Sequence, residues 1–185
     1  MTCNLSDAAA VDGLVSRAEE AIGPLDILVA NAGITRDGTL KKMTSEQWHE
    51  VVDTNLNSVF NTCRSVIESM LEHGYGRIIN ISYINGRKGQ FGQVNYAAAK
   101  AGMHGLTMSL AQETATKGIT VNTVSPGYIA TDMIMNIPEK VREAIRETIP
   151  VKRYGTPEEI GRLVAFLADK ESGFITGANI DINGG

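Results

Sequence analysis

The sequence predicts an α/β protein with a doubly wound parallel sheet of the Rossmann-like type. Four short runs rich in Val and Ile lie near Gly or Pro, as is typical of parallel strands that helices cover on both faces. Longer segments with helical spacing alternate with these runs, and such alternation implies crossover connections between parallel strands. The predicted strands are residues 25–30, 77–82, 120–124 and 178–182.

The predicted helices begin near residues whose side chains can cap them. Ser6 can cap a helix that ends before Gly23, where a Gly-Pro pair stops it. Thr156, followed by a first-turn proline and two acids, predicts another helix start. Two further segments are long and carry broad apolar faces. The expected helices are residues 6–22, a helix opening at residue 45, and residues 58–73, 96–117 and 156–167.

Length and composition indicate one globular domain spanning residues 1–185. The chain is 43% hydrophobic and 21% charged, and its net charge of −4 argues against a broad nucleic-acid-binding surface. No apolar run approaches the roughly 20 residues of a membrane-spanning helix, and the first residues do not resemble a signal peptide. We therefore expect a cytoplasmic protein with neither a nucleic acid nor a membrane as partner.

The cysteines and histidines give no indication of a metal site. Cys3 and Cys63 resemble neither a disulfide framework nor a pair of metal ligands. His49, His73 and His104 lie in different predicted helices without ligand spacing. No metal is predicted.

The strongest chemical signal is Tyr96-Ala-Ala-Ala-Lys100. Residues four apart on a helix share a face, so the phenol and the ammonium point into the same space. A nearby positive charge lowers the pKa of a phenol, which can then serve as a general acid toward a carbonyl oxygen. Taken alone, a surface Tyr and Lys at helical spacing explains the pattern better, so the interpretation depends on the surrounding motifs.

Further short motifs surround this pair in a fixed order. In chain order they are Asn31-Ala32-Gly33, Asn55-Leu56, the strand GRIINIS at 76–82, VNTVSPG at 121–127, Thr131-Asp132, Gly177 and Asn183-Gly184-Gly185. This series resembles the short-chain dehydrogenase/reductase family across essentially the whole chain. Within the family, the stretches GITRDGTLKKMT, GQFGQVNYAAAKAG, VNTVSPGYIATDM and IPVKRYGTPEEIG resemble the acetoacetyl-CoA reductase branch.

The resemblance implies three catalytic residues, Tyr96, Lys100 and Asn55. Tyr96 would protonate the substrate oxygen, and Lys100 would lower the pKa of Tyr96 and bind the nicotinamide ribose. Asn55 would hold a water for proton resupply, although a helix-interior Asn bonded to backbone is the plainer alternative. NADPH is the implied cofactor. Its implied binding residues are Asn31, Ala32, Gly33, Ile34, Thr35, Lys100, Pro126, Gly127, Ile129 and Thr131.

The same resemblance implies an acyl-CoA substrate and a homotetramer. Asp37, Gln90, Phe91, Gln93 and Tyr128 would contact the acyl group, with ordinary loop residues as the alternative for Gln90, Phe91 and Gln93. The implied reaction is NADPH-dependent reduction of acetoacetyl-CoA to (R)-3-hydroxybutanoyl-CoA for polyhydroxybutyrate synthesis. Two alternatives stay open: 3-oxoacyl-acyl-carrier-protein reductase, and a non-catalytic fragment or pseudoenzyme.

Two departures from the family pattern are expected to weaken activity. The sequence lacks the N-terminal βαβ segment with its glycine-rich cofactor turn, about two β-α units or roughly 60 residues. The family also has a serine at the place that Tyr83 holds here. Ser82 is adjacent, but neighbouring residues on a strand face opposite sides of the sheet. The loss of one such hydrogen-bond donor typically costs about 10²–10³ in rate.

Overall fold

The computed structural model describes residues 2–185, apart from the side chain of Met133. Four parallel strands form one sheet in the order β1 (Ile27–Ala30), β2 (Gly76–Ile81), β3 (Ile119–Pro126) and β4 (Asn179–Ile182). All residues of β2 and β3 are buried. The predicted fold class is confirmed, and each predicted strand lies within two residues of an observed one at both ends.

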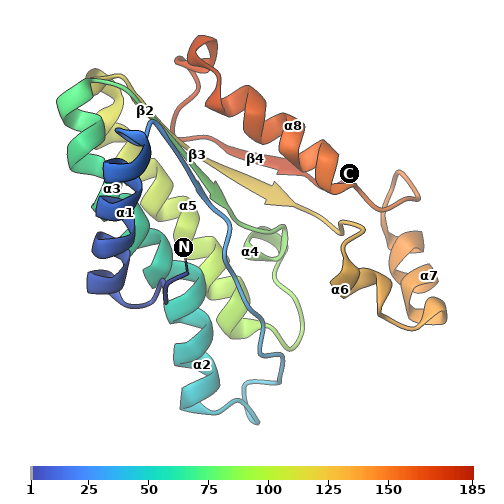
Figure 1. Cartoon of the computed structure of the whole chain (residues 1–185). Coiled ribbons are helices and arrows are strands. Elements are labelled where there is room, and N and C mark those ends of the chain that lie inside the picture. The colour runs from blue at the N-terminus through green and yellow to red at the C-terminus, as the bar shows by residue number, and fades with distance from the viewer. Residues whose placement is uncertain (1) are drawn as a thin grey trace.

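Helices cover both faces of the sheet (Figure 1). On one face, α1 (Ala8–Ile22), α3 (Ser58–His73) and α5 (Val94–Thr114) pack around Ile78 of β2 and Val121 of β3. On the other face, α8 (Pro157–Ala168) packs against Ile79, Ile81 and Val124. The alternation of side chains along each strand therefore divides the apolar core into two layers.

The helix starts follow their capping chemistry, with one correction. Asp7, not Ser6, caps α1, because its carboxylate accepts the N–H groups of Ala9 and Ala10. α2 (Ser45–Val52) and α8 each begin with a reciprocal capping box, centred on Thr44 and Thr156.

Several local elements were not foreseen from the sequence. α2 runs through a π-helical turn, Asp53–Asn57, directly into α3. α5 begins two residues earlier than expected and ends in a 3-10 turn over Ala115–Lys117. The remaining helices are α4 (Asn85–Lys88), α6 (Asp132–Met135), α7 (Glu139–Thr148) and the 3-10 turn Lys170–Ser172. Among residues 2–185, no helix has the length and apolar character needed to cross a membrane.

Candidate active site

The predicted site residues gather at the carboxyl edge of the sheet. Asn31 follows β1, Tyr83 follows β2 and Gly127 follows β3, and all three strands are parallel. The edge beyond the carboxyl ends of parallel strands is where such folds bind ligands. The first turns of α5 bring Tyr96 and Lys100 to the same place, beside the short helix α4 (Figure 1).

Lys100 is buried, and both its side-chain amine and its backbone carbonyl are hydrogen-bonded. Its side chain is only 3% exposed, and its Nζ donates to the carbonyl of Ile81 at 2.7 Å. Its backbone carbonyl accepts the hydroxyl of Ser82 at 2.9 Å. Burial lowers the pKa of Lys100 to about 8, because a dry environment disfavours the charged amine. The lysine therefore couples the start of α5 to the end of β2.

Tyr96 is half-buried, with its ring centroid 5.6 Å from Nζ of Lys100. Burial first, and then the carboxylate of Asp37, raise the pKa of Tyr96 to about 12. This direction is opposite to the lowering that the sequence analysis expected from Lys100. The physical reason is that desolvation affects both groups, and each is driven toward its neutral form.

Asn55 lies in the middle of the π-helical turn and is fully buried. Its Oδ1 accepts the N–H of Ile34 at 2.8 Å, and its Nδ2 donates to the carbonyl of Ile34, also at 2.8 Å. The side chain thus fixes the loop after β1, as in the backbone-bonded alternative weighed for it. Single π-helical turns often occur at functional sites, but the sequence pattern did not indicate this one.

Gly33 lies where that loop passes closest to the site. A Cβ atom at this position would be 2.7 Å from Oδ1 of Asn55 and 3.6 Å from Nζ of Lys100. Any side chain would displace Asn55 and fill the space above the lysine. A cofactor that must approach the backbone here requires glycine for the same reason.

Asp37 and Gln93, both predicted to contact substrate, are bonded to each other. Nε2 of Gln93 donates to Oδ2 of Asp37 at 3.0 Å, and Nδ2 of Asn85 donates to Oε1 of Gln93 at 2.9 Å. The carboxylate can only accept, so it fixes the orientation of both amides. Asn85, which no motif of the sequence singles out, belongs to this chain of hydrogen bonds.

Gln90 and Phe91 lie on the exposed loop before α5. Phe91 is 87% exposed, so nothing within the described residues covers its ring. Gln90 lines a hollow of about 370 Å³ together with residues from the loop after β1 and from the first turns of α5. The other lining residues are Gly38, Leu40, Gly89, Gly92, Val94, Ala97 and Ala98.

Tyr83 stands between two other tyrosines. Its ring centroid lies 6.0 Å from that of Tyr96 and 6.3 Å from that of Tyr128, in edge-to-face geometry. Burial raises the pKa of Tyr83, and the neighbouring phenols of Tyr128 and Tyr96 raise it further. The hydroxyl of the adjacent Ser82 is engaged by α5, because it donates to the Lys100 carbonyl at 2.9 Å and lies 3.1 Å from Nε2 of His104.

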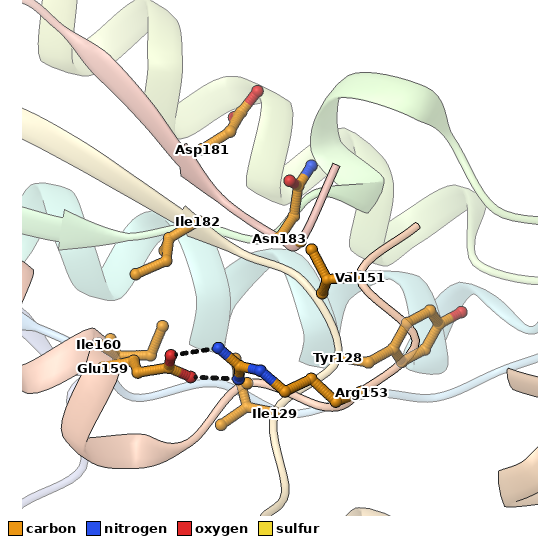
Figure 2. A pocket seen from close by; sticks show the side chains of 11 residues that line it. Tyr128, Ile129, Val151, Arg153, Glu159, Ile160, Asp181, Ile182 and Asn183 are labelled. Atoms are coloured by element: carbon orange, nitrogen blue, oxygen red, sulfur yellow. Dashed lines mark hydrogen bonds and ion pairs between the residues drawn. The ribbon is translucent and has the colours of Figure 1, made fainter. Parts of the chain in front are cut away.

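Pro126 ends β3, and Gly127, Ile129 and Thr131 follow it. A Cβ on Gly127 would lie 2.8 Å from Cα of Asn183, so packing against the C-terminal segment already requires glycine there. Tyr128 and Ile129 line a separate cavity of about 300 Å³ beside the start of α8 (Figure 2). Arg153 and Glu159 also line that cavity and form an ion pair whose shortest contact is 2.7 Å (Figure 2).

The site contains titratable groups but no group of metal ligands. Within residues 2–185, no three His, Cys, Asp or Glu side chains come together as a metal site would require. The titratable groups that the site brings together are three phenols, one buried amine and a carboxylate.

Comparison with known proteins defines the class. A family model described as enoyl-(acyl carrier protein) reductase matches residues 1–185. The chain belongs to the short-chain dehydrogenase/reductase family.

Its relatives include several proteins named acetoacetyl-CoA reductase. The chain is 55% identical over 182 residues to one from Cupriavidus necator, an alignment that covers 98% of this chain and 74% of the relative. It is 59% identical over 178 residues to another from Rhizobium meliloti, covering 96% and 73%. A 3-oxoacyl-[acyl-carrier-protein] reductase from Rickettsia conorii is 49% identical over 183 residues, covering 99% and 74%.

Proposed function

We propose that this protein reduces acetoacetyl-CoA to (R)-3-hydroxybutanoyl-CoA with NADPH as the reductant. The observation that carries the proposal is the placement of Tyr96 one helical turn from the buried Lys100, at the carboxyl edge of a parallel sheet. Relatives at 55% and 59% identity that are named acetoacetyl-CoA reductase support this substrate over other carbonyl compounds.

Tyr96 is proposed as the proton donor. Its pKa of about 12 keeps the phenol protonated at neutral pH, which is the form that a general acid must have before the reaction. As negative charge develops on the substrate oxygen, the proton of Tyr96 can move to it. Lys100, whose pKa lies near 8, can exchange a proton near neutral pH and is proposed to restore the phenol.

The residues around Gly33 fit a nicotinamide cofactor. The backbone there is open to close approach, and Asn31, Ala32 and Gly33 are all exposed at the strand end. Ile34, Thr35, Pro126, Gly127, Ile129 and Thr131 are proposed to complete the binding surface, with Lys100 at its centre. When bound, the cofactor supplies the hydride that reduces the carbonyl carbon.

Asp37, Gln93 and Tyr128 are proposed to orient the thioester, with Gln90 and Phe91 at the exposed rim. Asp37 and Gln93 hold each other in a fixed geometry at 3.0 Å, which favours a pre-organised contact with substrate. The hollow beside Gln90, mostly lined by glycine and apolar side chains, is the proposed passage for the carrier arm.

The test is steady-state oxidation of NADPH in the presence of acetoacetyl-CoA or the acetoacetyl carrier-protein thioester, with chiral analysis of the product. We expect a higher kcat/KM for the CoA thioester and the (R) product. Tyr96→Phe, which lacks the proton donor, is the matched control and is expected to lose on the order of 10²–10⁴ in kcat. A preference for the carrier-protein thioester would favour the 3-oxoacyl-acyl-carrier-protein reductase alternative, which is the name of the relative at 49% identity.

A second prediction concerns Tyr83. Because the serine of the family is replaced, the developing oxyanion has lost its usual donor, and a phenyl ring lies 6.0 Å from Tyr96. Tyr83→Ser is expected to raise kcat about 10²-fold, equivalent to about 2.7 kcal/mol, with a smaller change in KM. Equal kcat values for the two proteins would mean that the Tyr83 hydroxyl is itself an adequate donor.

A homotetramer is also proposed, built through α3 and α5. Large apolar side chains on these helices are about half exposed to solvent, among them Phe60 at 54% and Met108 at 51%. A two-fold contact would cover the same surface on both copies. We expect static light scattering at micromolar concentration to give the mass of an oligomer, and Met108→Glu to shift it toward a monomer. A stable monomer in the parent protein would contradict this proposal.

A further inference from the structure

Asn95 is a completely buried polar residue next to Tyr96 in sequence. It has 0% exposure, and every described hydrogen bond of its side chain goes to backbone atoms. Oδ1 accepts the N–H of Tyr96 at 2.8 Å, and Nδ2 donates to the carbonyls of Arg36 and Gln47 at 3.1 and 3.3 Å. One amide therefore links three separate segments of the site.

The hydrogen bond between Asn95 and Tyr96 satisfies one of the free backbone N–H groups at the start of α5. The first N–H groups of a helix have no intrahelical acceptor. Gln93, at the capping position, makes no side-chain cap, because its amide is bonded to Asp37 and Asn85 instead. Asn95 supplies the acceptor from inside the helix, directly at the residue that carries the phenol.

The bonds to Arg36 and Gln47 fix the loop after β1. Arg36 immediately precedes Asp37, and Gln47 belongs to α2. The guanidinium of Arg36 also pairs with Glu50 of α2, with an Nε to Oε2 distance of 2.8 Å. The loop is thus fastened to α2 by the ion pair at the surface, and to both α2 and α5 by Asn95 in the interior.

We propose that Asn95 is a positioning residue that sets Tyr96 of α5 against the Asp37 loop. The inference rests on the proposed function for the role of Tyr96 as proton donor, but the hydrogen bonds of Asn95 do not depend on which substrate is bound. Loss of the amide removes the partner that Asn95 provides to the N–H of Tyr96 and to the carbonyls of Arg36 and Gln47, at a partly buried position. Each such group carries a desolvation cost that local movement relieves. The loop that holds Asp37 and the first turn of α5 are therefore expected to move apart.

That separation changes the surroundings of Tyr96 in a predictable direction. The charged or titratable groups beside its ring are Asp37, Lys100 and Tyr83. Moving the Asp37 carboxylate away and admitting water both favour the phenolate. The pKa of Tyr96 therefore falls when Asn95 is removed, whereas a loss of stability alone would leave it unchanged.

The experiment compares Asn95→Ala and Asn95→Ser with Asn122→Ala in the full chain. Asn122 is a matched control, because it is also 0% exposed and also bonds backbone atoms, the carbonyl of Ile175 and the N–H of Ala178. It lies on β3 and faces the α8 side of the sheet, away from α5. Its substitution removes a comparable buried amide without touching the site.

Two readouts are measured on each protein. One is kcat and KM for acetoacetyl-CoA. The other is the titration of Tyr96 by NMR of tyrosine labelled at the ring carbon bearing the hydroxyl, assigned with Tyr96→Phe. We expect both Asn95 variants to lose about tenfold in kcat with KM within about twofold, and to titrate Tyr96 at lower pH. Asn122→Ala should keep both parent values even where its melting temperature falls.

The proposal is overturned if the Asn95 variants keep the parent titration of Tyr96, or if Asn122→Ala moves it equally. If the parent protein does not reduce acetoacetyl-CoA, the proposed function fails, and the titration alone decides the role of Asn95. The serine variant keeps the test decisive if Asn95→Ala does not fold, because its hydroxyl still offers a hydrogen-bond donor and acceptor at this position.

Discussion

The buried hydrogen bond from Lys100 to the carbonyl of Ile81 is the constraint on which the arrangement of the site depends. An amine that is 3% exposed must find an acceptor, and the end of β2 provides one at 2.7 Å. The adjacent residue, Ser82, returns a bond to the carbonyl of Lys100 at 2.9 Å. These two reciprocal bonds fix the rotation and height of α5 over the sheet, and hence the position of Tyr96 one turn earlier.

The other polar contacts of the site extend this constraint to the neighbouring segments. Asn55 bonds both backbone groups of Ile34. The neighbouring Gly33 then lies so close to Lys100 that a Cβ on it would be 3.6 Å from Nζ. Asn95 bonds Tyr96 and Arg36, so the same loop is tied to the helix start. In both cases a buried amide bonds backbone of the loop after β1, where no sheet or helix ladder supplies the partner. The loop after β1 is therefore held by side chains of the surrounding elements.

The sequence predicts the regular parts of this structure well, because they depend on local patterns. Apolar runs indicated all four strands, and Thr156 with its proline and acids marked the start of α8. The motif around Tyr96 predicted for the same reason that Lys100 would lie beside it, because helical spacing alone brings the two side chains together. The cap of α1 was misplaced by one residue, because Ser6 and Asp7 are both good caps and geometry selects between them.

What the sequence could not predict depends on tertiary surroundings. At the π-helical turn, the amide of Asn55 bonds Ile34, 21 residues away, a contact that the local sequence does not reveal. The raised pKa of Tyr96 follows from burial and from Asp37, neither of which the Tyr-Lys spacing reveals. Asn85 and Asn95 gave no signal, because a single Asn in a loop or helix has many uses, and only the folded chain shows which groups it meets.

The most direct test of this account is the pH dependence of stability in Lys100→Met against the parent protein. The pKa of Lys100 is about 8 in the folded protein, against the ordinary lysine value of 10.5 in the unfolded chain, so below pH 8 both states are charged and the folded state bears the full cost of desolvation. Between pH 8 and 10.5 the folded protein binds fewer protons than the unfolded chain, so the parent gains stability as pH rises. Urea unfolding at pH 7 and pH 10 should show the parent gaining roughly 2–3 kcal/mol relative to the methionine variant. An equal difference at both pH values would mean that Lys100 is not held in a dry environment, and would contradict the central role given to it.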